Sequence, residues 1–564
     1  MYFMTKKVKY STTEVAKYLS SAPKAIGAYI SDLEEQIQNL ANIGLALSKE
    51  RDMDKLLEMI LLEAKRIANS DGGTLYMMTD DQRLKFEIIM TDSLNFHMGG
   101  TSKENIPFYP VKLYDDEGEE NRSMIAAYVA LTGETVNLPD AYKAKGFDFS
   151  GTKMFDEKTG YRSKSFLTVP LKNHEDEIIG VLQLLNAQTQ KTKKIISFKP
   201  EVQKMVEALA SQAAVAITNK NLIRDLEALF ESFIKLIASA IDEKSPYTGG
   251  HCARVPEITI MLAEAVAATK DGPFADIIFS EKEMYELKIA AWLHDCGKVA
   301  TPEFVVDKST KLETIYDRVN EVETRFGILK RDEEIKRLKK ELEIEKDKTL
   351  SPKDRVAKLE LLMKEYRSKI KKLKSDLDFV KESNIGGEFM SGEKKDRIHE
   401  IADYKWKPNG KIQNFLSDDE VYNLTIPRGT LTPEERKVIN DHIVVTIKML
   451  EELPYPKHLQ NVPEFAGGHH EKLDGTGYPK GLIKDDMSVQ ARIMAIADIF
   501  EALTAKDRPY KKGKTLSQAM RILGFMKDDA HIDVDLFEIF VKEKIYMKYA
   551  EGFLDPEQID EVKI

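Results

Sequence analysis

The stretch Trp292–Lys298, WLHDCGK, closes the apolar run KIAAWL and sets His294 directly beside Asp295. Neighbouring residues on a helix point about 100° apart, so these two side chains cannot share one helix face. Burying both is costly unless another group pairs with them. A metal ion would supply that partner, and the rest of the sequence can be searched for further ligands.

Composition limits the classes of protein to which the chain can belong. Its 564 residues are enough for about three or four domains. A net charge of −10 argues against binding of a nucleic-acid polymer, although a small phosphate ligand in a basic pocket stays allowed. Cys252 and Cys296 are the only cysteines, so no disulfide framework is implied. No apolar run could span a bilayer and the N-terminus lacks a signal-type core, so we expect a cytoplasmic protein without a membrane partner.

In the first third of the chain, the sequence pattern changes from one typical of helices to one typical of β-strands. Apolar residues at spacings of three and four predict helices over about 30–49 and 53–68. Short β-type runs follow, bounded by Gly, Asp and Asn: GGTLYMMTDD, LKFEIIMTD, SFLTVPLKN and EIIGVLQLLNAQ. We therefore expect an N-terminal helical segment over 1–44 and an α+β domain over 45–199.

From Pro200 to about Asp242 the pattern is helical again. Because a helix of this length is rarely self-supporting, we interpret 200–235 as a connector that pairs with a second copy of itself in a homodimer. We expect residues 236–564 to form an all-helical domain, interrupted by a charge-rich insertion over 309–428.

The insertion has the pattern of a coiled-coil hairpin. Two runs keep alternating spacings of three and four: Ile315, Val319, Val322, Phe326 and Leu329, then Leu359, Met363, Tyr366, Ile370, Leu373, Leu377 and Val380. Between them, Ser351 can cap a helix that starts at Pro352 and has Asp354 at its third position. GGEFMSGEKKD and KPNGKIQN then indicate a looser return.

Further candidate ligands lie in the helical region. Most are spaced by roughly the length of a helical hairpin, which can bring them to one centre: His251, His294, Asp295, His442, His469, His470 and Asp498. A single histidine in a helix is more often a core residue with its hydrogen bonds satisfied. Five histidines in helical contexts, with an aspartate inside an apolar helix, are unlike a chance arrangement, so we interpret them as metal ligands. Five imidazoles and two carboxylates are too many for one ion, and they suit Fe, Mn, Zn or Ni. Two metals about 3.5–4 Å apart are a known arrangement for phosphoester hydrolysis.

These residues, in the ordered motifs HDxGK, HHExxDGxGYP and DxxEALTAxDRPY, resemble the HD-GYP family over about 236–308 and 428–550. The family comprises metal-dependent phosphodiesterases that hydrolyse the bacterial second messenger cyclic di-GMP to pGpG and GMP. The resemblance implies that all seven residues bind two divalent ions, iron or manganese ahead of nickel or zinc, with Asp295 bridging and a metal-bridging hydroxide attacking phosphorus. It also implies that Lys298 faces phosphate and that substrate is contacted by Gly477, Tyr478, Pro479, Arg508 and Lys511.

The sequence departs from the family pattern in two places that matter. Tyr247 stands four residues before His251, where three-metal members carry a glutamate, so we expect two ions. The insertion over 309–428 follows the His294-Asp295 pair directly; it could form a lid, dock a partner or dimerise, or it could simply be solvated. Two other functions stay open: a phosphodiesterase for another cyclic dinucleotide such as cyclic GMP-AMP, and a non-catalytic cyclic di-GMP receptor.

The stretch from Val136 to Asn173 resembles a GAF domain of the type found in cyclic-nucleotide phosphodiesterases. The match rests on Asp140-Ala141-Tyr142, Phe155-Asp156, Thr159-Gly160-Tyr161-Arg162 and a strand that ends in Pro170. An expected Asn is absent, with Thr152 nearest to it, and the domain has no cysteine for bilin attachment. The resemblance implies a domain that regulates the enzyme, either by binding a small ligand such as a cyclic nucleotide or as a ligand-free dimerising module.

Overall fold

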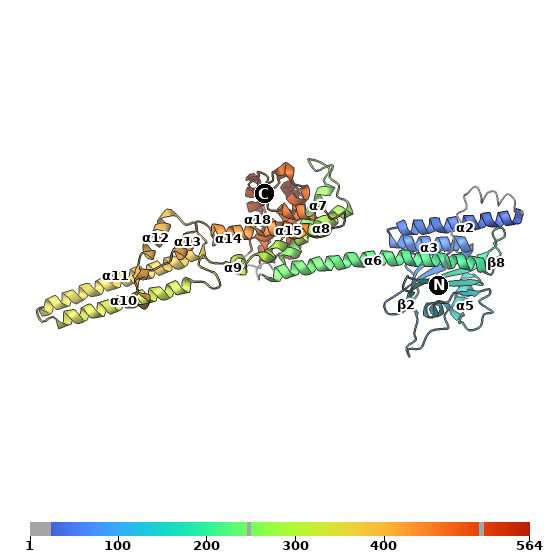
Figure 1. Ribbon diagram of the computed structural model, residues 1–564, viewed down its shortest axis with the longest axis horizontal. Helices are drawn as coiled ribbons and strands as arrows, with labels where there is room; N and C mark the ends of the chain where they lie inside the picture. The colour runs from blue at the N-terminus through green and yellow to red at the C-terminus, as the bar shows by residue number, and fades with distance from the viewer. Residues whose placement is uncertain (1–23, 245–249, 507–512, 564) are drawn as a thin grey trace, which may run out of the picture. The chain divides into compact units, whose positions relative to one another are not determined.

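A computed structural model of the chain describes residues 24–244, 250–506 and 513–563 (Figure 1). It divides into two compact units, Met1–Ala228 and Leu229–Ile564. The long helix α6 (Pro200–Lys244) begins in the first unit and ends in the second.

The first unit is built on an eight-stranded antiparallel sheet in the order β3-β2-β1-β7-β6-β5, with β4 beside β2 and β8 beside β7. The strands are β1 (Ser70–Met78), β2 (Arg83–Thr91), β3 (Phe96–Gly99), β4 (Val111–Lys112), β5 (Val136–Leu138), β6 (Phe166–Lys172), β7 (Ile178–Gln188) and β8 (Ile195–Ile196). The central strand β1 is almost fully buried, and a Cβ at Gly73 would come within 2.7 Å of Leu61, so the helix over this strand packs closely against it.

Helices cover both faces of this sheet (Figure 1). One apolar core joins α2 (Lys24–Lys49), α3 (Met53–Ala68) and the first half of α6 to the sheet. A second core joins α4 (Ile125–Thr132) to the sheet and includes Phe149, which directly precedes the short α5 (Ser150–Thr159). The turn η1 (Gly100–Ser102) contributes no residue to this core. The expected α+β fold over this part of the chain is therefore confirmed.

The second unit is helical around one large apolar core. Its main helices are α7 (His251–Ala268), α8 (Glu281–Leu293), η2 (Cys296–Ala300), α9 (Glu303–Val306), α14 (Pro433–Asn440), α15 (His442–Glu451), α16 (Val462–Gly467), η4 (Lys484–Asp486), α17 (Val489–Thr504), α18 (Leu516–Asp528), α19 (Val534–Lys542), α20 (Ile545–Phe553) and η5 (Pro556–Gln558). Capping residues determine where several of these helices begin. Ser280 forms a capping box with Glu283 at the start of α8, and Ser488 caps α17.

The insertion is a helical hairpin, as expected, formed by α10 (Val319–Lys346) and α11 (Pro352–Ile385). Ser351 accepts a hydrogen bond from the Asp354 amide, which starts α11 as the sequence predicts. Two of the apolar residues that we expected at the contact between the two helices do not lie there. Ile315 lies before α10 and is 93% exposed, because Asp317 accepts the Val319 amide and begins the helix there. Met363 is 37% exposed, and Leu362 is the less exposed of the two.

The return from the hairpin is more ordered than we expected. It contains α12 (Gly392–Ala402), the small pair β9 (Lys405–Trp406) and β10 (Gln413–Asn414), the turn η3 (Pro408–Gly410) and α13 (Asp418–Leu424). These elements enclose a core with the base of the hairpin, in which Phe326 and Phe415 pack edge to face. The polar, glycine-containing stretches, which we expected to be loops, therefore belong to a small folded module.

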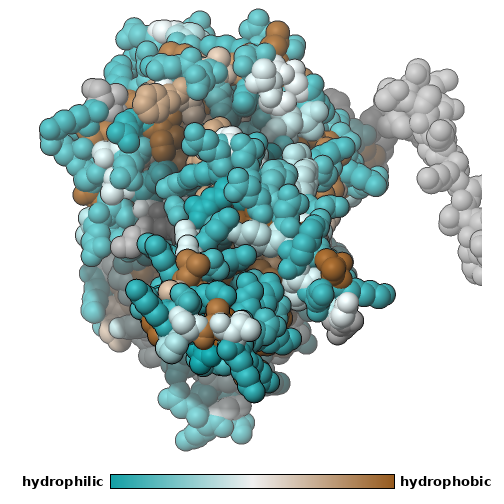
Figure 2. Space-filling view, turned by 90° about the vertical axis from the view of Figure 1, so that its left-hand side faces the viewer, coloured by the Kyte–Doolittle hydropathy of each residue, from teal (hydrophilic) through white to brown (hydrophobic). Residues whose placement is uncertain are grey.

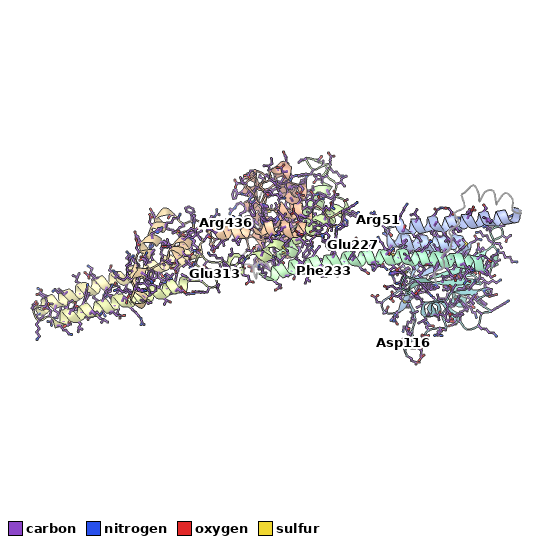
Figure 3. All side chains as sticks on the ribbon, viewed as in Figure 1. Arg51, Asp116, Glu227, Phe233, Glu313 and Arg436 are labelled. Carbon is purple, nitrogen blue, oxygen red and sulfur yellow. The ribbon has the colours of Figure 1, made fainter. Side chains whose placement is uncertain are left out.

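Two buried lysines tie the base of the insertion to its surroundings. Lys308 donates to both carboxylate oxygens of Glu435 at 2.8 Å and to Asn423 at 3.0 Å. Lys311 donates to the carbonyls of Leu424 and Ile426 at 3.0 and 2.9 Å, and burial lowers its pKa to about 8. Glu313, just before the hairpin, and Arg436, next to Glu435, are labelled in Figure 3. Entry and exit of the insertion are therefore held together.

Hydrophilic side chains dominate the face seen in Figure 2, where apolar residues are scattered. Within the described ranges, no helix has the length and apolarity needed to cross a membrane.

Candidate metal centre

The seven predicted ligands come together in the second unit, at the ends of four helices and inside a fifth. His251 opens α7, His294 and Asp295 follow α8, His442 opens α15, His469 and His470 follow α16, and Asp498 lies within α17. Among the described residues, they fall into two sets: His251, His294 and Asp498, and Asp295, His442, His469 and His470. Within each set, one candidate ligand atom per residue lies within 4.8 Å of the others.

Asp295 lies between the two sets. Its Oδ2 is 3.3 Å from His251 Nε2 and 3.2 Å from His294 Nε2. Its Oδ1 is 3.1 Å from His442 Nε2. One carboxylate therefore presents an oxygen to each set, which is the geometry that a bridging ligand requires.

Backbone carbonyls orient three of the imidazoles. Nδ1 of His294, His442 and His469 lies 2.8, 2.5 and 2.6 Å from the carbonyl oxygen of the residue three positions earlier. Because that carbonyl can only accept, Nδ1 is the donor, so in the neutral imidazole Nε2 is the atom whose lone pair can face a metal ion.

Three buried polar atoms at the centre have no hydrogen-bond partner within the described part of the chain: Asp295 Oδ1, His442 Nε2 and His469 Nε2. The first two lie close together without hydrogen-bond geometry. Buried groups left in this state cost about 1–3 kcal/mol each. Divalent ions would satisfy all three, so the residues fit a metal site.

Charge differs across the centre. Burial opposes ionisation of Asp295, but Lys298 and His294 outweigh it and hold its pKa well below the usual range. Burial would also lower the pKa of His294, yet the Asp295 carboxylate raises it to about 9. Burial lowers the pKa of His470 to about 4. Burial also lowers the pKa of His469, so these two imidazoles favour the neutral form that binds metal.

Glu501 supports the centre, although we did not predict a role for it from the sequence. Its buried carboxylate contacts His251 Nδ1 and accepts from Arg254 Nε at 2.6 Å, so it orients a predicted ligand. The signal was present, because Glu501 lies three residues after Asp498 and shares its helix face.

Close packing holds the turn after Asp295 against α15. The Gly297 amide donates to Thr446 Oγ1 at 2.9 Å. A Cβ at Gly297 would lie 2.0 Å from the His442 carbonyl oxygen and 2.5 Å from the Thr446 nitrogen. Glycine here permits Asp295 and His442 to face each other.

Lys298 lies one turn beyond Asp295, and its ammonium contacts Asp295 Oδ2. Coulomb attraction to this carboxylate outweighs burial and raises the pKa of Lys298. The lysine is therefore a fixed positive charge beside the centre.

The loop that carries Gly477, Tyr478 and Pro479 folds over His470. The Tyr478 ring stacks on His470 with centroids 4.9 Å apart. Glu471, a second residue whose role was not foreseen, accepts the Lys480 and Leu482 amides at 2.7 and 3.0 Å. A Cβ at Gly477 would come within 2.3 Å of the Lys472 nitrogen, so this loop requires glycine there.

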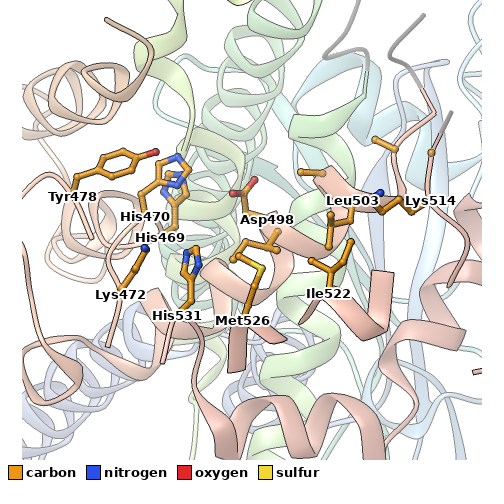
Figure 4. Close-up of a pocket in the computed structure, with 14 residues that line it drawn as sticks. His469, His470, Lys472, Tyr478, Asp498, Leu503, Lys514, Ile522, Met526 and His531 are labelled. Atoms are coloured by element: carbon orange, nitrogen blue, oxygen red, sulfur yellow. The ribbon is translucent and has the colours of Figure 1, made fainter. Parts of the chain in front are cut away.

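An open cavity of about 420 Å³ adjoins the centre (Figure 4). His469, His470 and Tyr478 lie at one side of Asp498, and Leu503, Ile522 and Lys514 lie at the other. Lys472, Met526 and His531 also line it. Arg508 and Lys511, like Tyr247, lie outside the described residues. The helix of Asp498 ends at Thr504.

In the GAF-type motif, polar side chains bind each other. Buried Asp156 accepts from the Ser163 amide at 2.8 Å and from the Tyr142 hydroxyl at 2.9 Å. The Arg162 guanidinium lies 3.2 Å from the centroid of the Tyr142 ring. Tyr161 donates to Asp71 at 2.7 Å. The predicted motif thus forms an internal network between α5 and the sheet.

Comparison with known proteins identifies two domains. Residues 52–217 match the family model of the GAF domain, and residues 417–536 match that of the HD domain. The 3'3'-cGAMP-specific phosphodiesterase 3 of Vibrio cholerae is 35% identical over 24% of this chain and 28% of its own length. A probable cyclic di-GMP phosphodiesterase of the same organism is 35% identical over 24% and 32%, and the cyclic di-GMP phosphodiesterase of Thermotoga maritima is 40% identical over 16% and 25%. The chain thus spans less than a third of the length of these relatives.

Proposed function

We propose that this chain, which joins a GAF domain to an HD domain of the HD-GYP type, is a metal-dependent phosphodiesterase that hydrolyses cyclic di-GMP to pGpG or GMP. One observation carries the proposal: Asp295 presents one oxygen to each of two histidine-rich sets, beside an open cavity. A receptor that only binds the dinucleotide has no need of such a pair of sets.

The two sets of ligands support two ions per chain. Iron, manganese, nickel and zinc all accept imidazole and carboxylate ligands, and we propose iron or manganese as the first candidates. When bound, such ions lower the pKa of water and neutralise phosphate oxygens during in-line displacement. Asp295 would be shared between the ions, and Lys298 would hold the fixed charge that helps to bind a phosphate.

The cavity suits the rest of a dinucleotide. Leu503, Ile522 and Met526 offer an apolar wall for a base, whereas Lys472 and Lys514 offer cations. In this proposal Tyr478 borders the scissile phosphate, because its ring lies on His470. Arg508 and Lys511 would contact the dinucleotide from the adjoining segment.

A second candidate substrate is 3'3'-cGAMP, because a relative specific for that dinucleotide matches this chain as well as a probable cyclic di-GMP phosphodiesterase does. The two share one guanine and the same backbone linkage, so the metal centre does not discriminate between them.

The test is turnover of both dinucleotides by purified protein loaded with Fe²⁺ or Mn²⁺, with metal content measured in parallel. We expect about two ions per chain and release of linear product. Asp295→Ala should abolish hydrolysis, whereas His399→Ala, an exposed histidine on α12, should not. Tight binding without turnover would favour the receptor, and wild-type turnover in Asp295→Ala would contradict the bridging role.

The proposal includes a homodimer formed through α6. Leu222, Leu226, Leu229, Phe233 and Leu236 follow a heptad spacing and are 52–66% exposed; Phe233 is labelled in Figure 3. A parallel coiled coil would bury this stripe. Sedimentation should show a dimer that Leu226→Glu together with Phe233→Glu converts to monomer; an unchanged dimer would contradict it.

We further propose that the GAF domain regulates turnover, with a cyclic nucleotide as its candidate ligand. A cytoplasmic, reducing location fits the two free, buried cysteines.

A further inference from the structure

Two side chains in the last turn of α6 contact the backbone of segments that adjoin predicted metal ligands. The helix ends at Lys244, and Asp242 and Lys244 both lie in this turn. Residues two apart on a helix point in nearly opposite directions, so the two side chains reach different segments. Neither was singled out by its sequence, and neither is a predicted ligand.

Lys244 holds the turn that follows Asp295. Its ammonium donates to the carbonyls of Lys298 at 3.1 Å, of Thr301 at 2.7 Å, and of Val299. An ammonium has three donors, and here each has a backbone acceptor. Two of these carbonyls lie in η2 and the third belongs to the residue that directly follows it, where a cation also interacts favourably with the helix dipole. Lys244 therefore fixes the turn that carries Lys298 against Asp295.

Asp242 holds the helix that begins with His251. Gly250, the residue before α7, supplies no side-chain cap. The buried Asp242 carboxylate instead accepts the Cys252 amide at 3.2 and 3.4 Å. A carboxylate at a helix N-terminus satisfies an amide that has no partner within the helix. Asp242 thus takes the place of a capping residue next to His251.

The two contacts hold segments that carry a ligand of each set. His251 belongs to one set and Asp295 to the other. We propose that Lys244 and Asp242 are positioning residues, through which the last turn of α6 sets how tightly both sets hold their ions. The inference rests on the proposed metal centre. It gives the connector a direct route to the catalytic residues, because a rotation or shift of its end moves His251 and Asp295 relative to each other.

The test compares full-length Lys244→Met with wild type by Mn²⁺ titration of metal-free protein and by hydrogen exchange. Loss of residues that support metal ligands typically weakens metal affinity about 10- to 100-fold, and we expect a loss in this range. Amides of 296–301 should exchange faster, while those of α18 do not change. Lys244→Arg, which keeps a cation, should recover most of the affinity. Lys235→Met is the matched control, because Lys235 is exposed on the same helix and pairs only loosely with Glu231 at 3.7 Å.

Asp242→Asn provides an independent variant if Lys244→Met folds poorly, and should weaken Mn²⁺ binding with faster exchange at the start of α7. Wild-type Mn²⁺ affinity and exchange in both variants would overturn the inference while leaving the proposed function intact. Failure of wild-type protein to bind either Mn²⁺ or Fe²⁺ would instead contradict the proposed function. A general loss of thermal stability in Lys244→Met with unchanged metal affinity would mean a merely structural role and would also overturn the inference.

Discussion

Replacing Gly297 with alanine should separate the two halves of the metal centre. The new Cβ would lie 2.0 Å from the His442 carbonyl oxygen, whereas real Cβ contacts essentially never fall below 3.0 Å. The gap between η2 and α15 must therefore open by at least about 1 Å, and both obstructing atoms nearest to the Cβ belong to backbone. Metal sites tolerate errors of only about 0.2 Å in ligand distances. Asp295 Oδ1 and His442 Nε2, now 3.1 Å apart, could not both keep their ligand positions.

We expect kcat/KM to fall by about 100-fold, the usual cost of a 1 Å misplacement of catalytic groups. Overpacking should also lower the free energy of unfolding by about 1–3 kcal/mol. Turnover with metal analysis measures the first effect, and urea denaturation measures the second. Gly327→Ala is the control: its Cβ would meet nothing within 4 Å on helix α10, so it should leave activity unchanged and stabilise slightly. Wild-type metal content and kcat/KM in Gly297→Ala would refute the reasoning.

Three further variants test other contacts. Glu501→Gln removes the charge that faces His251 Nδ1 and should weaken one metal site about 10- to 100-fold, which elemental analysis would show as a content near one ion per chain. Lys308→Met leaves Glu435 without its buried partner and should cost about 3–5 kcal/mol in urea denaturation; a change below 1 kcal/mol would contradict this. Arg508→Ala should lower kcat/KM about tenfold to a hundredfold while both ions stay bound, because a bond to a charged group contributes about 1.5–3 kcal/mol. Unchanged kcat/KM would exclude that binding role.

Much of the fold could be predicted because its signals are local. The second helix was expected over Met53–Ala68, which are its bounds in the structure. Ser351 caps α11 because a hydroxyl and a following proline act within one turn of the chain. The errors arose where a local polar contact opposes the apolar spacing. Ile315 continues the three-and-four pattern, but Asp317 binds the Val319 amide and also accepts from Asn384, which lies on the other helix of the hairpin. That second contact depends on tertiary structure, so the spacing alone could not place the start of α10.

The candidate site shows the same division between local and long-range information. Its proposed ligands could be selected from sequence because buried histidines and carboxylates are rare unless something pairs with them. Their supports could not, since Thr446, Asp242 and Lys244 are ordinary residues whose partners are fixed only by the path of the chain. Glu501 is intermediate: its spacing from Asp498 placed it on the correct face, but its bond to His251 joins residues 250 positions apart. Sequence therefore specifies which atoms would hold the ions, while the fold determines how firmly those atoms are held. If α6 regulates this protein, it acts on that second property, which is why the regulatory contacts carry no motif.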